Sequence, residues 1–207
     1  MVPICSADTS PQLTQIERSL LLQLAQRSIS YGMECGTLLP LDPAGYPEAL
    51  QQKRASFVTL NRFSGLRGCI GHLNAIQPLA ADVNENAFAA AFRDPRFTPL
   101  TSAELEGLEM HISVLSSAVP LVVATEKALR DKLRPGIDGV ILKLGRRQGT
   151  FLPSVWESLP DADAFLAHLK MKAGLPRDYW SDQIEVLRYQ TESFGSPFLA
   201  AKKTERD

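Results

Sequence analysis

Apolar and polar positions near the N-terminus follow the period of an amphipathic helix. Ile16 and Leu20 lie four residues apart, a spacing that places both side chains on one face of a helix. Thr14 and Glu17 have the spacing of a capping box, which marks a helix start. Because glycine often follows the last helical turn, the pattern predicts a helix of about four turns that stops near Gly32.

The next patterns predict a hairpin followed by a helix. Residues 55–62 are rich in β-branched and aromatic types, and a Ser-Gly turn at 64–65 separates them from a second apolar stretch at 66–73. These two stretches read as the paired strands of a hairpin. Residues 79–92 form an alanine-rich helical segment after a proline, and its small side chains permit close packing on a sheet.

The remaining sequence predicts short strands and helices in alternation. We expect strands at 110–116, 139–145, 150–152 and 184–194, a turn at 146–149, and helices at 125–133 and 164–173. This order favours an α+β fold, a two-lobed single domain with a mainly antiparallel sheet flanked by helices. The domain is predicted to cover residues 10–196, with 197–207 as a disordered C-terminal tail.

Composition and charge indicate a reduced, cytoplasmic protein. The 207 residues carry 22 Lys and Arg against 23 Asp and Glu, so nucleic-acid binding is disfavoured. Three cysteines without a Cys-x-x-Cys pair argue against a disulfide framework. We expect no membrane segment, because no stretch reaches ~20 apolar residues. Common nucleotide, zinc-protease and hydrolase motifs are missing, and no cofactor is indicated.

Residues 65–71, Gly-Leu-Arg-Gly-Cys-Ile-Gly, contain the candidate site. Gly68 and Gly71 leave the backbone around Cys69 open to close approach. Arg67 suits an anionic group or a buried carboxylate. A thiolate beside this guanidinium would be a nucleophile, which makes Cys69 the candidate catalytic residue. The alternative is an inert, buried cysteine on a strand.

A thiolate nucleophile needs a base, and two histidines could supply it. His72 follows Cys69 by three residues, so on a strand it points to the opposite face unless a bulge reorients it. His111 lies on another predicted strand and reaches Cys69 if the two strands are neighbours. The three residues could also bind a metal, but zinc sites usually show more ligands at tighter spacing, and we predict no metal site.

The loop at 94–100, Asp-Pro-Arg-Phe-Thr-Pro-Leu, is a second candidate for binding. Both residues that precede a proline are pushed out of the helical region, which predicts an extended loop. Asp94 could form a bidentate pair with Arg96 or with Arg67. The alternative is an internal salt bridge that only fixes the loop.

These segments resemble the AMME-syndrome candidate protein domain, in the microbial form called AmmeMemoRadiSam system protein A. The resemblance runs from residue 13 to residue 194, and residues 65–71 are its most specific motif. Further matching segments, in order, are 94–100, 112–116, 151–155 and 172–175 with Trp180. The resemblance implies a two-lobed α+β fold, and it implies a Memo-like protein and a radical S-adenosylmethionine enzyme as partners.

The resemblance transfers some site residues better than others. The family often has Thr or Ser where His72 stands and an acidic residue near His111. The transferable set is therefore Arg67, Cys69 and the Asp94 and Arg96 pair.

Two functions compete, and the sequence leaves open whether the protein is an enzyme. In one, Cys69 acts as a thiolate on a small or peptide-borne substrate. In the other, the protein is an accessory or binding module that docks a partner, with the glycine-rich motif as a packing element. We favour the second, because no base accompanies the thiol in the sequence. Nothing in the sequence indicates an oligomeric state.

Overall fold

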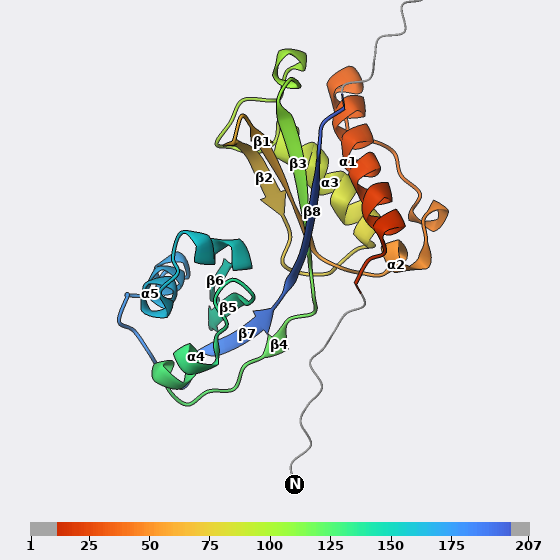
Figure 1. Cartoon of the computed structure of the whole chain (residues 1–207). Helices are drawn as coiled ribbons and strands as arrows, with labels where there is room; N and C mark the ends of the chain where they lie inside the picture. The colour runs from red at the N-terminus through yellow and green to blue at the C-terminus, as the bar shows by residue number, and fades with distance from the viewer. Residues whose placement is uncertain (1–11, 200–207) are drawn as a thin grey trace, which may run out of the picture. The chain divides into compact units, whose positions relative to one another are not determined.

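The computed structural model describes residues 12–199, and it divides into two compact units (Figure 1). The first unit comprises 12–114 and 192–199, and the second comprises 115–191. Each unit has its own hydrophobic core and its own four-stranded sheet. The α+β class is confirmed, although the strands form two sheets rather than one.

The first unit places helices against a sheet in the order β2-β1-β3-β8. Its elements are α1 (Gln15–Cys35), α2 (Glu48–Gln51), β1 (Ser56–Arg62), β2 (Gly65–Gly71), α3 (Leu79–Phe92), β3 (Leu108–Leu115) and β8 (Thr191–Pro197), with short 3-10 turns at Pro43–Gly45 and Ser102–Glu104. Helix α3 packs against β1 and β2, and α1 packs against α3. Strand β2 is therefore an edge strand whose inner neighbour is β1.

Helix α1 begins as the sequence predicts and ends later. Thr14 and Glu17 form the predicted capping box. The helix continues past Gly32, because this glycine is a contact point rather than a stop: a Cβ there would lie 2.8 Å from the ring of Phe88. Gly36, with φ of 70°, ends the helix instead.

The predicted hairpin and the alanine-rich helix are confirmed. Strands β1 and β2 pair antiparallel, with a register shift between Leu60 and Asn61. The turn predicted at 64–65 lies one residue earlier: Phe63 and Ser64 form it with φ of 49° and 64°, as a tight two-residue hairpin connection requires. Helix α3 has the predicted bounds, 79–92. The hairpin and α3 together position the candidate site.

The second unit has a sheet in the order β4-β7-β5-β6. Its elements are β4 (Val119–Pro120), α4 (Glu126–Lys132), β5 (Gly139–Leu144), β6 (Arg147–Phe151), a 3-10 turn at Pro153–Glu157, α5 (Ala162–Lys172) and β7 (Glu185–Tyr189). Helix α5 packs against β6, and Phe165 of α5 stacks on Trp156 in the core. Strand β4, with two residues, is too short to leave a sequence pattern.

Two predicted elements of this half are corrected. The turn predicted at 146–149 is shorter, because Gly145 adopts a φ of 57° and Arg147 already pairs with Leu144. The single strand predicted at 184–194 is two strands, β7 and β8, which belong to different sheets. The chain leaves the second unit at this break, where the N–H of Gln190 donates to Ser116 Oγ at 3.0 Å.

The ends of the predicted domain fall close to the limits of the described residues. Positions 10 and 11 and the tail residues 200–207 lie outside them. Within the predicted tail, Phe198 is buried in the core of the first unit, and its N–H donates to the carbonyl of Leu108. Between residues 12 and 199, no helix combines the length and the apolar character that crossing a bilayer requires.

Candidate functional site

The glycines of the 65–71 motif allow close packing around β2. A Cβ on Gly68 would lie 2.1 Å from the carbonyl oxygen of Ala90, so the strand sits directly against the backbone of α3. A Cβ on Gly71 would lie 2.3 Å from the ring of Phe57. Real Cβ atoms do not approach so closely, and both positions therefore require glycine for packing reasons.

Arg67 is buried and its charge is balanced within the first unit. Its Nε and Nη2 donate to the two carboxylate oxygens of Glu104 at 2.7 and 3.0 Å, and Nη2 also donates to the carbonyl of Thr98 at 2.9 Å. These bonds lower the pKa of Glu104 from 4.5 to about 2, with the hydrogen bond from Arg67 as the largest cause. The guanidinium thus anchors the loop after α3. The sequence does not single out Glu104 as this partner, because it lies 37 positions away.

Asp94 and Arg96 cap the free edge of β2 at Cys69. The Asp94 carboxylate accepts the N–H of Cys69 at 2.9 Å, and Arg96 Nη2 donates to the carbonyl of Cys69 at 3.2 Å. The predicted bidentate pair is confirmed for Arg96, whose Nε and Nη2 bond the two oxygens of Asp94 at 2.9 and 2.7 Å. The hydrogen bond from Arg96, followed by the N–H of Cys69, holds the pKa of Asp94 well below its usual range. The pair thus satisfies backbone groups that a neighbouring strand would otherwise bond.

Cys69 is half-buried, and its thiol lies next to a hydroxyl. Its Sγ is 3.3 Å from Thr59 Oγ1 on β1. Thr59 pairs with His111 on β3, so His111 is two strands away from Cys69. The ring of His111 lies over β8, because a Cβ on Gly195 would be 2.5 Å from its Nδ1. The structure therefore does not bring His111 to the thiol as a base.

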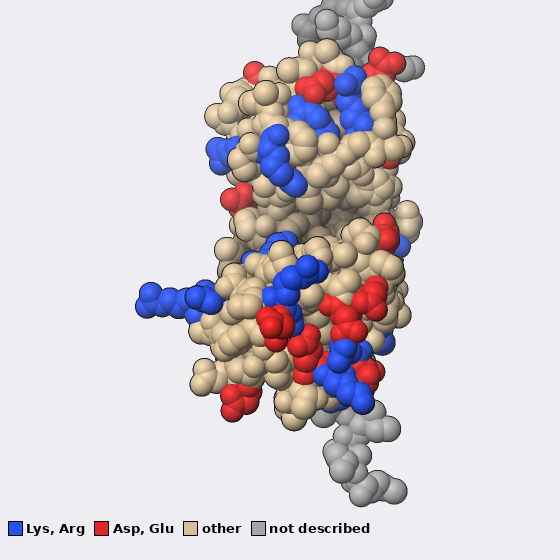
Figure 2. Space-filling view, turned by 90° about the vertical axis from the view of Figure 1, so that its left-hand side faces the viewer, with Lys and Arg blue, Asp and Glu red and all other residues tan. Residues whose placement is uncertain are grey.

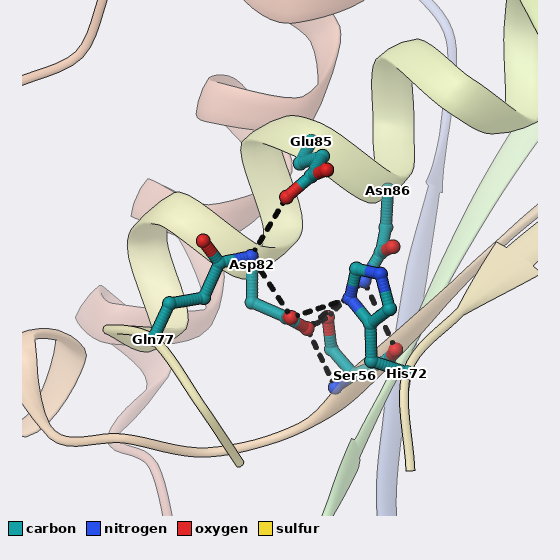
Figure 3. Close-up of polar contacts among 6 residues, drawn as sticks. All are labelled: Ser56, His72, Gln77, Asp82, Glu85 and Asn86. Carbon is teal, nitrogen blue, oxygen red and sulfur yellow. Dashed lines mark hydrogen bonds and ion pairs between the residues drawn. The ribbon is translucent and has the colours of Figure 1, made fainter. Parts of the chain in front are cut away.

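His72 points toward α3, as its position three residues after Cys69 predicts. Its Nδ1 lies 2.8 Å from Oδ1 of Asp82, a residue in the first turns of α3 (Figure 3). Cys69, His72 and His111 thus have separate partners. In the part of the chain that the structure describes, no group of three or more His, Cys, Asp or Glu side chains is arranged to hold a metal ion.

Asp82 is the centre of a buried polar cluster that sequence reasoning missed. Oδ2 accepts the N–H of Ser56 at 2.8 Å, its hydroxyl at 2.6 Å and Nδ2 of Asn86 at 2.9 Å. Oδ1 accepts Nε2 of Gln77 at 3.3 Å, which also bonds Glu85 at 2.9 Å. Figure 3 shows these side chains converging from β1, α3 and the segment between β2 and α3. The available signal was Asp82 and Asn86 at helical spacing among alanines.

The charged surface in Figure 2 mixes both signs. Lys and Arg side chains are interspersed with Asp and Glu side chains on the visible face of each unit. On this face the mixed charges differ from the basic patch or stripe that is typical of nucleic-acid-binding surfaces.

Comparisons with known proteins identify the family. The sequence model of the AMMECR1 family matches residues 22–194. A protein of Methanothermobacter thermautotrophicus is 35% identical, covering 88% of this chain and 95% of its own length. One of Methanopyrus kandleri is 34% identical, covering 95% and 96% respectively. The crystal structure of the uncharacterized protein PH0010 from Pyrococcus horikoshii superimposes with a TM-score of 0.80 at 32% identity, over 88% of this chain and 93% of that one.

The fold is that of a two-sheet α+β protein, in which the loop at 94–96 caps the strand that carries the 65–71 motif. The chain belongs to the AMMECR1 family.

Proposed function

We propose that this chain is an accessory protein that binds a Memo-like protein and a radical S-adenosylmethionine enzyme. The observation that carries this proposal is that the charges of the motif and of the 94–100 loop are paired within the first unit. Arg67 is bonded to Glu104, and Arg96 is bonded to Asp94. Neither histidine near the motif contacts the thiol, since His72 bonds Asp82 and His111 lies two strands away. A thiol that neither of these histidines contacts favours a docking role over nucleophilic catalysis.

Exposed side chains next to the motif offer a docking surface, which we call the hairpin-edge surface. It comprises Phe63, Leu66 and Arg96, with 69% of Phe63, 47% of Leu66 and 53% of the Arg96 side chain exposed. Exposed aromatic and arginine side chains are frequent anchors of protein interfaces. The loop that holds Arg96 is fixed to β2, so the surface is preorganised for binding.

The proposal is tested by a binding titration of the full chain against each partner from the same organism. Leu66→Asp places a charge on the hairpin-edge surface without touching a buried group, and we expect it to weaken binding by about tenfold or more. Cys69→Ser is expected to bind within about twofold of the original chain. Val122→Asp, at a residue 83% exposed in the second unit, is the matched control. Equal affinity of Leu66→Asp and Val122→Asp would contradict the proposal.

The alternative is an enzyme that uses Cys69 as a thiolate on a small or peptide-borne substrate. It is favoured by the partial exposure of Cys69 and by the Thr59 hydroxyl beside its Sγ. In a reaction reconstituted with the Memo-like protein and the radical S-adenosylmethionine enzyme, Cys69→Ser separates the two functions. Turnover that persists supports the accessory role, and turnover lost while binding is unchanged supports the thiolate enzyme.

A further inference from the structure

The cluster around Asp82 holds a histidine ring in one orientation. Asp82 is fully buried. Among the described residues, His72 is the side chain capable of carrying a positive charge that contacts Asp82. The carboxylate already accepts hydrogen bonds from Ser56, Asn86 and Gln77. Both oxygens of Asp82 therefore have hydrogen-bond partners other than the imidazole. The cluster is satisfied without His72, and it holds the His72 ring in one orientation.

The hydrogen-bond pattern fixes which nitrogen of His72 carries the proton. The backbone N–H of Ser56 and the amide groups of Asn86 and Gln77 can only donate to Asp82. These donors suit an ionised carboxylate, which can only accept, and beside it Nδ1 of the neutral ring is the donor toward Asp82. Nε2 then carries the lone pair.

The second ring nitrogen is available to a ligand. The His72 side chain is 36% exposed, whereas Asp82 is 1% exposed. No hydrogen bond from Nε2 is found within residues 12–199, and no dashed line meets this atom in Figure 3. A histidine with a carboxylate on Nδ1 and an open Nε2 has the arrangement of a general base that the carboxylate orients.

We propose that His72 and Asp82 form a general-base dyad, separate from the Cys69 thiol, for a ligand that carries a hydroxyl or an amine. His72 is the catalytic residue and Asp82 its positioning residue. In the step, the O–H or N–H bond of the ligand breaks, its proton passes to Nε2, and its electron pair stays on the ligand oxygen or nitrogen. The ring becomes an imidazolium that keeps its Nδ1–H bond to Asp82.

The chemistry around the dyad selects this class of ligand. Glu85 accepts a hydrogen bond from Gln77 beside Asp82, so two carboxylates lie on this side of α3. No Lys or Arg bonds either carboxylate among the described residues. An anionic ligand would meet repulsion here, whereas a group that donates hydrogen bonds meets acceptors.

The probe for this dyad is diethylpyrocarbonate, which transfers an ethoxycarbonyl group to an unprotonated ring nitrogen. The chain has three histidines, His72, His111 and His168, and peptide mass spectrometry of the labelled full chain gives a rate for each. Exposure alone predicts that His72 is slowest, because its side chain is 36% exposed against 48% for His111, and His168 is exposed too. We expect the reverse order, with His72 at least about threefold faster than either. His111, with Glu109 at 3.8 Å, is a matched control with a looser carboxylate.

Asp82→Asn tests the positioning role, because an Asp-to-Asn change beside histidine selects the other tautomer while leaving the geometry intact. The new amide would donate to Nδ1 and move the proton to Nε2. We expect the labelling rate of His72 to fall by about tenfold, with His111 and His168 unchanged. The ¹⁵N spectrum of His72 should change from the Nδ1–H to the Nε2–H form.

The labelling rates of the three histidines can support the dyad or overturn it. In the original chain, a His72 rate at or below that of His111 and His168 overturns the proposal, whether or not the variant folds. An unchanged His72 rate in Asp82→Asn that keeps its circular dichroism also overturns it. A fast His72 in the original chain together with the tautomer change supports it.

Discussion

The charged residues of the 65–71 motif and of the 94–100 loop connect β2 to the segments around it. Arg67 connects β2 to the turn at Ser102–Glu104, and Asp94 with Arg96 connects β2 to the end of α3. Each is a charge-assisted pair, with the Arg67 side chain 10% and the Asp94 side chain 2% exposed. Breaking a buried pair by removing one partner costs more than the pair contributes, because the other charge is left buried.

Glu104→Gln is therefore expected to destabilise the first unit and to change its acid response. The pKa of Glu104 falls from 4.5 to about 2 on folding, so its stabilisation is present above pH 4.5 and is lost as the pH falls toward 2. At pH 7 the variant should lose about 2 to 4 kcal/mol in the free energy of unfolding. Urea unfolding from pH 7 to pH 3 checks this, with the exposed Glu106→Gln as the control.

In this measurement, the original chain should lose stability between pH 4.5 and pH 3 more steeply than Glu104→Gln. Parallel curves for the two proteins would contradict the assignment of Glu104 as the partner of Arg67.

The elements that the sequence predicts well are those set by neighbouring residues. The capping box of α1, the β1–β2 hairpin and the bounds of α3 all depend on local chemistry, although the hairpin turn lies at 63–64 rather than at the predicted 64–65. The split of 184–194 into β7 and β8 was not predictable, because alternation is the same in either sheet. The partners of the site residues were missed for a similar reason. Glu104 and Asp82 meet Arg67 and His72 only after the hairpin packs on α3.

Gly68→Ala tests the contact between β2 and α3. The added Cβ would lie 2.1 Å from the backbone carbonyl of Ala90, which cannot turn aside as a side chain can. We expect a loss of about 3 kcal/mol or more in the free energy of unfolding. Gly65→Ala is the matched control in the same strand, because its Cβ would lie 3.4 Å from the nearest atom, the carbonyl of Arg62. Similar stabilities of the two variants would show that β2 does not lie against α3 as described.

At the scale of the whole molecule, two cores stabilise two units. The buried cluster of the first unit includes Leu24, Val83 and Met110, and that of the second includes Trp156 and Phe165. The candidate site lies entirely in the first unit. Both tryptophans of the chain, Trp156 and Trp180, lie in the second unit.

Tryptophan fluorescence should therefore report on the second unit, while far-ultraviolet circular dichroism reports on both. Because the cores are separate, Gly68→Ala should lower the urea midpoint seen by circular dichroism more than the midpoint seen by fluorescence. Equal shifts of the two midpoints would mean that the units unfold as one cooperative body.

We infer that the 65–71 motif connects β2 to the surrounding loops and contributes to a docking surface. We also infer that the motif does not activate the thiol of Cys69. The rate at which iodoacetamide alkylates Cys69 in the folded chain at pH 7, mapped by mass spectrometry, tests this most directly. Cys35, exposed at the end of α1, provides the reference rate within the same molecule. We predict that Cys69 reacts no faster than Cys35, because the residue is half-buried and neither His72 nor His111 contacts its sulfur. A Cys69 rate about tenfold above that of Cys35 would refute the inference and identify an activated thiolate.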